Sequence, residues 1–282
     1  MILPLNLPSG VRLAFSPPQV MAIINCTPDS FYGPSRASSP EAAADRALAA
    51  QEEGAGVVDF GAESTRPGAE YIDAEEEIRR LIPALRLFRR RSTLPVSVDT
   101  RKAVVARAAL DEGADMINDV STLADPGMAA LCAERKAAVV ITHSPPRTTP
   151  KTMGKAAGTY ADAAGEVKAF LLAAADRARA EGVARERIIL DPGIGFGKSA
   201  ADNLLLINRL AEIGGGDYPV LVGLSRKSFI GEITGRPPEG RLPGTIAANA
   251  AALLGGAAVL RVHDTAAAVD LIRVFGALGK KG

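Results

Sequence analysis

The chain has 282 residues, of which 47% are hydrophobic and 23% charged, so it can bury a sizeable core. Its 33 basic and 32 acidic residues leave a formal charge of +1, which argues against a general nucleic-acid-binding protein, because such proteins present a basic face. Two cysteines, Cys26 and Cys132, are too few for a disulfide framework and favour reduced thiols in a cytoplasmic protein. No signal peptide and no membrane-spanning apolar run is recognisable in the sequence.

Short apolar runs rich in Val, Ile and Leu recur along the chain and predict β-strands. They show little alternation of polar and apolar residues, which is typical of parallel strands that are buried on both faces. The predicted strands are residues 20–25, 57–60, 96–98, 116–118, 138–142, 188–190, 220–222 and 258–262.

Longer Ala-rich amphipathic stretches separate these runs and predict helices. The stretch 74–91 begins with acidic residues and ends with basic ones, which is the order that the helix dipole favours. The predicted helices are residues 40–54, 74–91, 102–113, 125–136, 160–182, 200–213, 243–255 and 265–278.

The eight strand–helix units predict an α/β fold, a closed (β/α)8 TIM barrel, which typically needs about 250 residues. No linker, low-complexity tract or charge run marks a boundary, so residues 1–282 are expected to form one domain. Residues 3–7 and 11–15 are expected to pair as a short N-terminal β-hairpin that plugs the base of the barrel. A doubly wound open sheet is the alternative that the alternation of elements leaves open.

Polar residues follow every predicted strand, at the end where barrel enzymes place their active sites. These strand ends are residues 25–31, 61–68, 99–101, 118–119, 143, 191–196, 225–228 and 261–264. A single Asp, Asn or Ser after a strand is equally well explained as a helix N-cap. That explanation is weaker for all eight ends together, and both histidines of the chain, His143 and His263, lie there too.

The side chains at these ends form two chemical groups. Hydroxyl and cationic donors suit an oxyanion such as a diphosphate, and they are Thr65, Arg66, Ser225, Arg226, Arg261 and His263. Asp99, Asn118 and Asp191 can accept and donate hydrogen bonds in a plane, which suits a flat aminated heterocycle. Lys227 can donate to a carbonyl of the same ring or lie against its face.

Other catalytic templates fit the sequence poorly. Residues 193–199 resemble a phosphate-binding loop, but the first Gly is one residue too close to Gly-Lys-Ser, and Lys198 breaks the G-x-G-x-x-G pattern. Two histidines are few for a catalytic zinc site, and no G-x-S-x-G nucleophile elbow is present. The sequence therefore favours neither zinc-dependent nor covalent catalysis.

Seven motifs, in order, resemble those of the dihydropteroate synthase family. They are Asn25-Cys-Thr-Pro-Asp-Ser-Phe31, Glu63-Ser-Thr-Arg-Pro-Gly68, Ser97-Val-Asp-Thr100, Ile117-Asn-Asp119, Asp191-Pro-Gly-Ile-Gly-Phe196, Ser225-Arg-Lys-Ser228 and Arg261-Val-His-Asp264. The resemblance extends over residues 20–275 and implies a TIM barrel, in agreement with the strand count. It also implies a transferase of folate biosynthesis, and a sulfonamide target, that joins 6-hydroxymethyl-7,8-dihydropterin diphosphate to p-aminobenzoate and releases diphosphate.

The resemblance further implies roles for individual residues. The residues implied to bind the pterin are Asp99, Asn118, Asp191, Lys227 and Arg261. Those implied to bind the diphosphate are Thr65, Arg66, Arg261 and His263. Those implied to form the p-aminobenzoate pocket are Phe31, Thr65, Pro67 and Ser228. Asn25 would help to hold a Mg²⁺ ion, and the implied catalytic residues are Asp29, Lys227 and Asp99, with Asp29 stabilising a cation or accepting the amine proton.

The implied reaction is a dissociative, cation-like substitution between small molecules, with no nucleic-acid or membrane partner. The family also implies a homodimer, and the predicted helices 160–182 and 243–255 are candidates for packing against the second copy.

The chain departs from the family pattern at three places. Residues 32–35 replace a Gly-rich stretch, Ser144 follows His143 where the family has Met, and Ala62 stands where the family often has Gly. Two other functions therefore stay open. One is a non-catalytic pterin-binding homologue, which would bind pterin without turnover. The other is a pterin-dependent methyltransferase, which would not need the loops at 25–31 and 63–68.

Overall fold

The computed structural model describes residues 3–26, 39–63, 71–144 and 160–279. Eight parallel strands lie in the order β8-β7-β6-β5-β4-β3-β10-β9. A bridge between Leu190 and Val220 joins β8 to the residue before β9, so the sheet closes on itself. The eight strands are β3 (Gln19–Asn25), β4 (Val57–Gly61), β5 (Val96–Asp99), β6 (Met116–Asp119), β7 (Ala138–Thr142), β8 (Ile188–Asp191), β9 (Leu221–Val222) and β10 (Val259–Val262). The predicted barrel and its strand positions are confirmed, and the open sheet is excluded.

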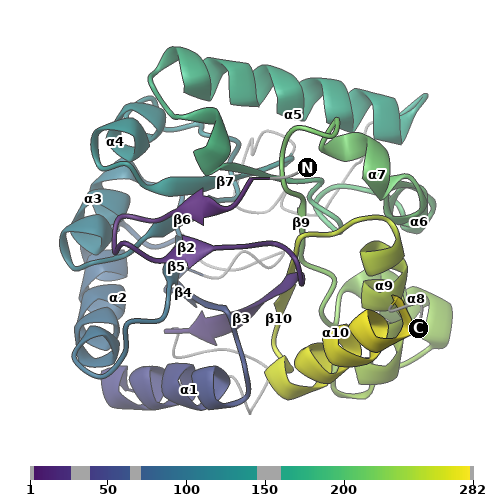
Figure 1. The fold of residues 1–282 in the computed structure, drawn as a ribbon, viewed down its shortest axis with the longest axis horizontal. Coiled ribbons are helices and arrows are strands. Elements are labelled where there is room, and N and C mark those ends of the chain that lie inside the picture. Colours follow the sequence, from purple (N-terminus) through teal and green to yellow (C-terminus); the bar gives the residue numbers. More distant parts are fainter. Residues whose placement is uncertain (1–2, 27–38, 64–70, 145–159, 280–282) are drawn as a thin grey trace.

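Helices surround the strands on the outside, with α1 to α3 on one side of the barrel and α8 to α10 on the other (Figure 1). The α-helices of the described residues are α1 (Pro40–Glu52), α2 (Ala74–Arg89), α3 (Ala103–Asp111), α4 (Met128–Glu134), α5 (Ala163–Ala180), α6 (Ala200–Asn208), α7 (Leu210–Ile213), α8 (Ser228–Thr234), α9 (Leu242–Leu254) and α10 (Thr265–Gly279). Short 3-10 helices are η3 (Arg185–Arg187) and η4 (Pro238–Gly240). None of the helices in the described ranges is long and apolar enough to cross a membrane.

The helix predictions differ from the structure at two places. The predicted helix 200–213 is two helices, α6 and α7, separated at Arg209. α8 was not predicted from the sequence, because its seven residues are too few to show a helical repeat. It follows Lys227 directly and ends at Gly235, whose left-handed φ of 68° stops the helix.

The predicted hairpin is confirmed and closes the base of the barrel. β1 (Leu5–Asn6) pairs antiparallel with β2 (Arg12–Leu13), and this purple hairpin lies in front of the strands in Figure 1. Its apolar side chains share one buried cluster with residues from the strands, and the members of this cluster are Leu5, Leu7, Leu13, Met21, Val57, Met116, Ala138, Val140, Ile189, Leu221, Ala258 and Val259. The hairpin therefore excludes water from the N-terminal end of the barrel interior.

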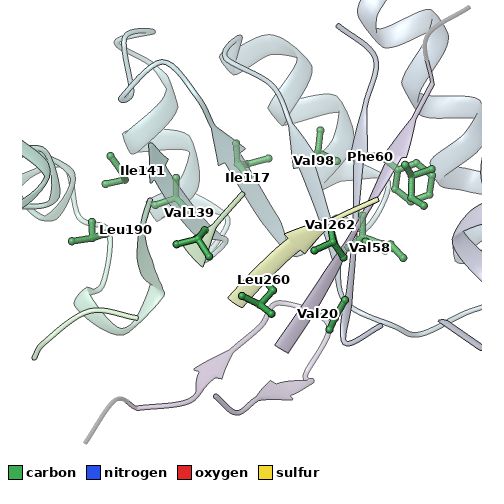
Figure 2. Close-up of a cluster of buried hydrophobic side chains, with 14 of the residues drawn as sticks. Val20, Val58, Phe60, Val98, Ile117, Val139, Ile141, Leu190, Leu260 and Val262 are labelled. Carbon is green, nitrogen blue, oxygen red and sulfur yellow. The ribbon is translucent and has the colours of Figure 1, made fainter. Parts of the chain in front are cut away.

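A second set of strand side chains faces outward and packs against the helices. Successive strands contribute the aliphatic and aromatic residues that Figure 2 labels, namely Val20, Val58, Phe60, Val98, Ile117, Val139, Ile141, Leu190, Leu260 and Val262. These positions alternate with those of the hairpin cluster, because successive side chains of a strand point to opposite faces. Both faces are apolar in this half of the barrel, which explains the continuous apolar runs in the sequence.

One buried carboxylate connects the hairpin to the barrel wall. Asp115, directly before β6, accepts hydrogen bonds from the backbone N–H groups of Ser9 (3.1 Å) and Val96 (3.0 Å). The guanidinium group of Arg89, at the end of α2, lies 2.5 Å from the same carboxylate. The Asp115 side chain is almost completely buried, so these donors replace the water that it gives up on folding.

We expect Asp115→Ala to lower the free energy of unfolding by about 3 kcal/mol, because it leaves a buried N–H group and the Arg89 guanidinium without their acceptor. Glu112→Ala is the matched control, since its partner Arg86 is 56% exposed, and it should cost less than about 1 kcal/mol. Chemical denaturation measures both values. Equal losses in the two variants would show that Asp115 does not have this role.

Candidate active site

The interior of the barrel changes from apolar to polar toward the carboxyl ends of the strands. In β4 the inward positions are Val57 and then Asp59, and in β10 they are Val259 and then Arg261. The same alternation places Ser97 and Asp99 of β5, Asn118 of β6, Thr142 of β7 and Asp191 of β8 on the inner side. Seven inward side chains thus form a buried polar layer above the hairpin cluster.

Arg261 is the centre of a hydrogen-bonded network in this layer. Its Nε lies 2.7 Å from Oδ2 of Asp59, and its Nη2 lies 2.7 Å from Oδ2 of Asp99. Asn118 donates from Nδ2 to the same Asp59 oxygen at 3.1 Å. The network joins β4, β5, β6 and β10, so residues that are far apart in the sequence share one cation. Oδ1 of Asn118 and Oδ1 of Asp59 are buried and have no partner among the described residues, which leaves acceptors available to a ligand.

Burial and charge have opposite effects on Asp99. Burial raises its pKa to about 7, while the adjacent Arg261 lowers it and Asp59 raises it further. Burial also disfavours the charged form of Arg261, but Asp59 and Asp99 outweigh this effect, and the pKa of Arg261 is raised. Arg261 therefore stays charged, and Asp99 changes its charge near neutral pH.

A glycine-rich loop, residues 192–197, follows β8 and lies beside Lys227. The Asp191 carboxylate accepts from the backbone N–H of Gly193 at 2.7 Å, which fixes the start of the loop. A side chain at Gly193 would meet the carbonyl oxygen of His143 at 1.9 Å, and its φ is 64°, so only glycine fits this position. The amine of Lys227 donates to the carbonyl of Ile194 and lies 4.5 Å from the centre of the Phe196 ring.

Asp191 and Lys227 affect each other's ionisation. Burial raises the pKa of Asp191, and the nearby Lys227 and backbone donor lower it. Burial lowers the pKa of Lys227 to about 8, against the attraction of Asp191 and together with the repulsion of Arg261. The two side chains therefore attract each other electrostatically at the same end of the barrel as Arg261.

In the turn after β9, the side chain of Arg226 has other partners than the oxyanion that was predicted. Arg226 was grouped with the oxyanion donors, but its guanidinium group binds both oxygens of Asp264, at 2.9 and 2.8 Å. It also donates to the carbonyls of Pro238 (2.8 Å) and Glu239 (2.9 Å). Its φ of 57° turns the chain so that Arg226 faces the helices while Lys227 faces the loop after β8. Arg226 therefore holds the turn together, which the sequence alone does not reveal.

The other predicted residues of this end lie near the same turn. His263 follows β10, and its Nδ1 lies 2.9 Å from the hydroxyl of Ser225. Ser228 is exposed at the first position of α8, directly after Lys227. Asn25 is the last residue of β3 and is half-buried.

Comparison with known proteins identifies the family. Residues 21–263 match the family described as "Pterin binding enzyme". The dihydropteroate synthase of Synechocystis sp. is 43% identical over 92% of this chain and 89% of its own. The chain belongs to the dihydropteroate synthase family. The Xanthomonas albilineans dihydropteroate synthase with 4-aminobenzoic acid has a TM-score of 0.91, 43% identity and 100% coverage of both chains. The Burkholderia cenocepacia dihydropteroate synthase complexed with 7,8-dihydropteroate has a TM-score of 0.88 and 38% identity, covering 98% of this chain and 96% of its own.

This family membership agrees with the predicted resemblance, and members of the family are transferases of folate biosynthesis. Among the predicted pterin residues, the structure joins Asp99, Asn118 and Arg261 in one network and brings Lys227 within electrostatic reach of Asp191. The remaining predicted residues lie outside the described residues, and they are Asp29, Phe31, Thr65, Arg66 and Pro67. The altered stretch 32–35 also lies outside them, while Ser144 is half-buried after β7.

Three further residues at this end of the barrel could not be singled out from the sequence. Asp59 lies inside an apolar strand, and its signal is its position two residues before the strand end, on the same face. Phe196 belongs to a quoted motif, but only the structure shows its ring against the Lys227 amine. In the sequence, Lys198 only breaks the pattern of a phosphate-binding loop. In the structure, its amine lies within hydrogen-bonding distance of the loop after β8.

We expect Asp59→Asn to lower the free energy of unfolding by about 1–3 kcal/mol, because the amide cannot compensate the buried charge of Arg261. Ser97→Ala is the matched control, since Ser97 pairs with Asp59 in the β4–β5 register and its buried hydroxyl has no partner among the described residues. It should change stability by less than about 1 kcal/mol. Denaturant titration of both variants tests this, and an Asp59→Asn protein as stable as wild type would contradict the network.

Proposed function

We propose that the protein joins 6-hydroxymethyl-7,8-dihydropterin diphosphate to p-aminobenzoate, forming 7,8-dihydropteroate and diphosphate. The observation that carries this proposal is the buried polar layer, in which carboxylate and amide oxygens lie beside two cations at the carboxyl end of a barrel. The relatives support the choice of substrates, because one binds 4-aminobenzoic acid and another binds 7,8-dihydropteroate.

The pterin ring fits the acceptors and donors of this layer. Asp99, Asn118 and Asp191 come from β5, β6 and β8 on one side of the barrel wall and offer oxygens to the amino group and ring N–H groups of a pterin. The buried and unpartnered Oδ1 of Asn118 supports such a ligand, since buried polar atoms nearly always have a partner. Lys227 donates to the ring carbonyl, and Arg261 lies next to Asp99 at the ring's other edge.

We place the diphosphate at the end of β10, on Arg261 and His263, with Thr65 and Arg66 as further donors. Asn25 suits Mg²⁺, because its amide oxygen is a hard ligand. The described residues contain no cluster of three or more His, Cys, Asp or Glu residues. Mg²⁺ is usually held by few protein ligands together with phosphate oxygens and water, which Asn25 and the diphosphate would provide. Bound there, Mg²⁺ would neutralise charge on the leaving diphosphate.

The chemistry is a substitution in which the bond to the diphosphate loosens before the arylamine attacks. Three carboxylates, Asp59, Asp99 and Asp191, face two cations, Arg261 and Lys227, in the polar layer, and in their charged forms they would stabilise a cation-like pterin methylene. We assign Asp29 to the stabilisation of this cation or to the removal of the amine proton. We assign Phe31, Thr65, Pro67 and Ser228 to the p-aminobenzoate pocket, where closure would exclude water from the reactive carbon.

We also propose a homodimer that works in the cytoplasm as one domain. The buried, unpaired thiols of Cys26 and Cys132 suit a reducing compartment. Large apolar side chains are exposed on three neighbouring helices, namely Ile233 of α8, Leu254 of α9 and both Val274 and Leu278 of α10. A surface of this kind suits a second copy of the chain, and a single monomeric species in analytical ultracentrifugation would exclude it.

We expect the purified protein to release diphosphate from the pterin diphosphate only when p-aminobenzoate and magnesium are present, with dihydropteroate formed in equal amount. Coupled diphosphate detection and chromatography measure the two products, and omission of p-aminobenzoate is the control. Tight pterin binding without turnover would instead identify a non-catalytic homologue. Methyl transfer from a folate to a corrinoid would identify the methyltransferase.

We expect Asp191→Asn to weaken pterin binding about 10-fold to about 100-fold, because charge-assisted hydrogen bonds from the ring are lost. Asp176→Asn is the control, since Asp176 is an exposed carboxylate of α5 that is 70% accessible. Isothermal titration calorimetry measures both dissociation constants. An unchanged affinity of the Asp191 variant would remove this residue from the pterin site.

A further inference from the structure

The amine of Lys198 joins the loop after β8 to the end of β7. Its Nζ lies 2.9 Å from the carbonyl oxygen of Gly193 and 3.2 Å from that of Phe196. It also lies 2.9 Å from Nδ1 of His143 and 3.4 Å from the His143 carbonyl. The His143 acceptors follow β7, and the Gly193 and Phe196 acceptors follow β8. The pairing of these two strands ends at Thr142 and Asp191, before any of these acceptors. Lys198 therefore connects both sides of this part of the barrel mouth.

We propose that Lys198 is a positioning residue, which holds the loop 192–197 so that Phe196 and the Lys227 amine are correctly placed for the reaction. The proposal rests on the proposed function for its kinetic consequences. Its structural basis is independent of that function. Lys227 donates to the carbonyl of Ile194 and lies over the ring of Phe196, and both of these residues belong to the loop that Lys198 contacts.

The backbone of the loop has high conformational freedom because it contains three glycines, so contacts from side chains are needed to fix its conformation. Gly193, Gly195 and Gly197 have φ values of 64°, 82° and 57°, in the region that glycine favours. Glycines lose the most conformational entropy when they are ordered. Besides Lys198, the buried Asn203 of α6 accepts from the N–H of Gly195 at 2.8 Å. Lys198 supplies the bonds on the side of the loop that faces β7.

The protonation of the pair agrees with this geometry. Burial lowers the pKa of His143 to about 3, so its ring is neutral and Nδ1 can accept a hydrogen bond from Lys198. A charged Lys198 has three N–H donors for its three nearest acceptors, while the neutral amine has only two. The loop is therefore held most completely when Lys198 is protonated.

Lys198 loses its proton near neutral pH. Burial lowers its pKa to about 7, Asp191 and Asp202 raise it, and Lys227 lowers it. The groups that face it come from β7 (His143), β8 (Asp191), α6 (Asp202) and the turn before α8 (Lys227). Because the folded pKa lies below the usual value, the full set of bonds exists below about pH 7 and weakens as the pH rises above it.

The first test is Lys198→Met, which keeps the length of the side chain and removes its donors. Hydrogen exchange of the peptide that covers residues 192–197 should become faster in this variant at about pH 6.5, where Lys198 of the wild-type protein is mostly protonated. The midpoint of global unfolding should not change. Lys168→Met, a change at a half-buried lysine of α5, is the matched control and should leave the exchange of this peptide unchanged. Wild-type exchange in the Lys198 variant would overturn the proposal.

The second test is kinetic and separates positioning from general stability. We expect Lys198→Met to lower kcat/KM about 10-fold to about 100-fold, the usual effect of losing a residue that orients others. Wild-type kcat/KM should fall as the pH rises through about 7, and the variant should lose the part of this fall that Lys198 contributes, while the contributions of Asp99 and Lys227 stay. Lys198→Arg, which keeps the charge, should restore part of kcat/KM. A variant with the wild-type pH profile and rate would overturn the proposal.

His143→Leu provides a variant that does not remove the lysine itself. It takes away one acceptor, so it should speed exchange of the loop less than Lys198→Met, and the double variant should add little to Lys198→Met alone. Fully additive effects would overturn the pairing. If the wild-type protein itself shows no p-aminobenzoate-dependent turnover, the proposed function fails, while the hydrogen-exchange results still decide the role of Lys198.

Discussion

The structure depends on the two-residue repeat of strands in a closed barrel. Closure buries the inner face as well as the outer one, so a charged side chain at an inner position needs a partner inside the barrel. Asp59, Asp99 and Asn118 find theirs around Arg261, at distances of 2.7 to 3.1 Å. The hairpin can close the other end with leucines because no polar partner is needed there. The fold and the site therefore follow from the same constraint.

The position of the site was predictable because it follows from strand ends, and strand ends are readable from apolar runs. Four of the predicted residues are the last or next-to-last residue of their strand, where the apolar run meets the polar loop, namely Asp99, Asn118, Asp191 and Arg261. Asp59 was missed because a single polar residue within a run of buried ones does not end the strand. Its partner Arg261 is about 200 residues away, and no local pattern signals a pairing over that distance.

The direction of side chains in turns was less predictable than the position of strands. Arg226 and Lys227 are adjacent cations in one motif, and the residue types alone do not show that their side chains point in different directions. The left-handed φ of Arg226 sends its guanidinium group to Asp264, while Lys227 reaches the loop after β8. Such a backbone angle on a non-glycine residue depends on long-range partners, here Asp264 and the hydroxyl of Thr245.

Three separately held parts of the barrel mouth meet around Lys227. The Arg261 network fixes β4, β5, β6 and β10, Arg226 fixes the turn after β9, and Lys198 and Asn203 fix the loop after β8. The reaction rate of a ligand bound between these parts depends on their relative position, because a misplacement of about 1 Å can lower the rate by a large factor. Substitutions at residues that hold these parts, and that do not touch substrate, should therefore affect kcat/KM in this protein.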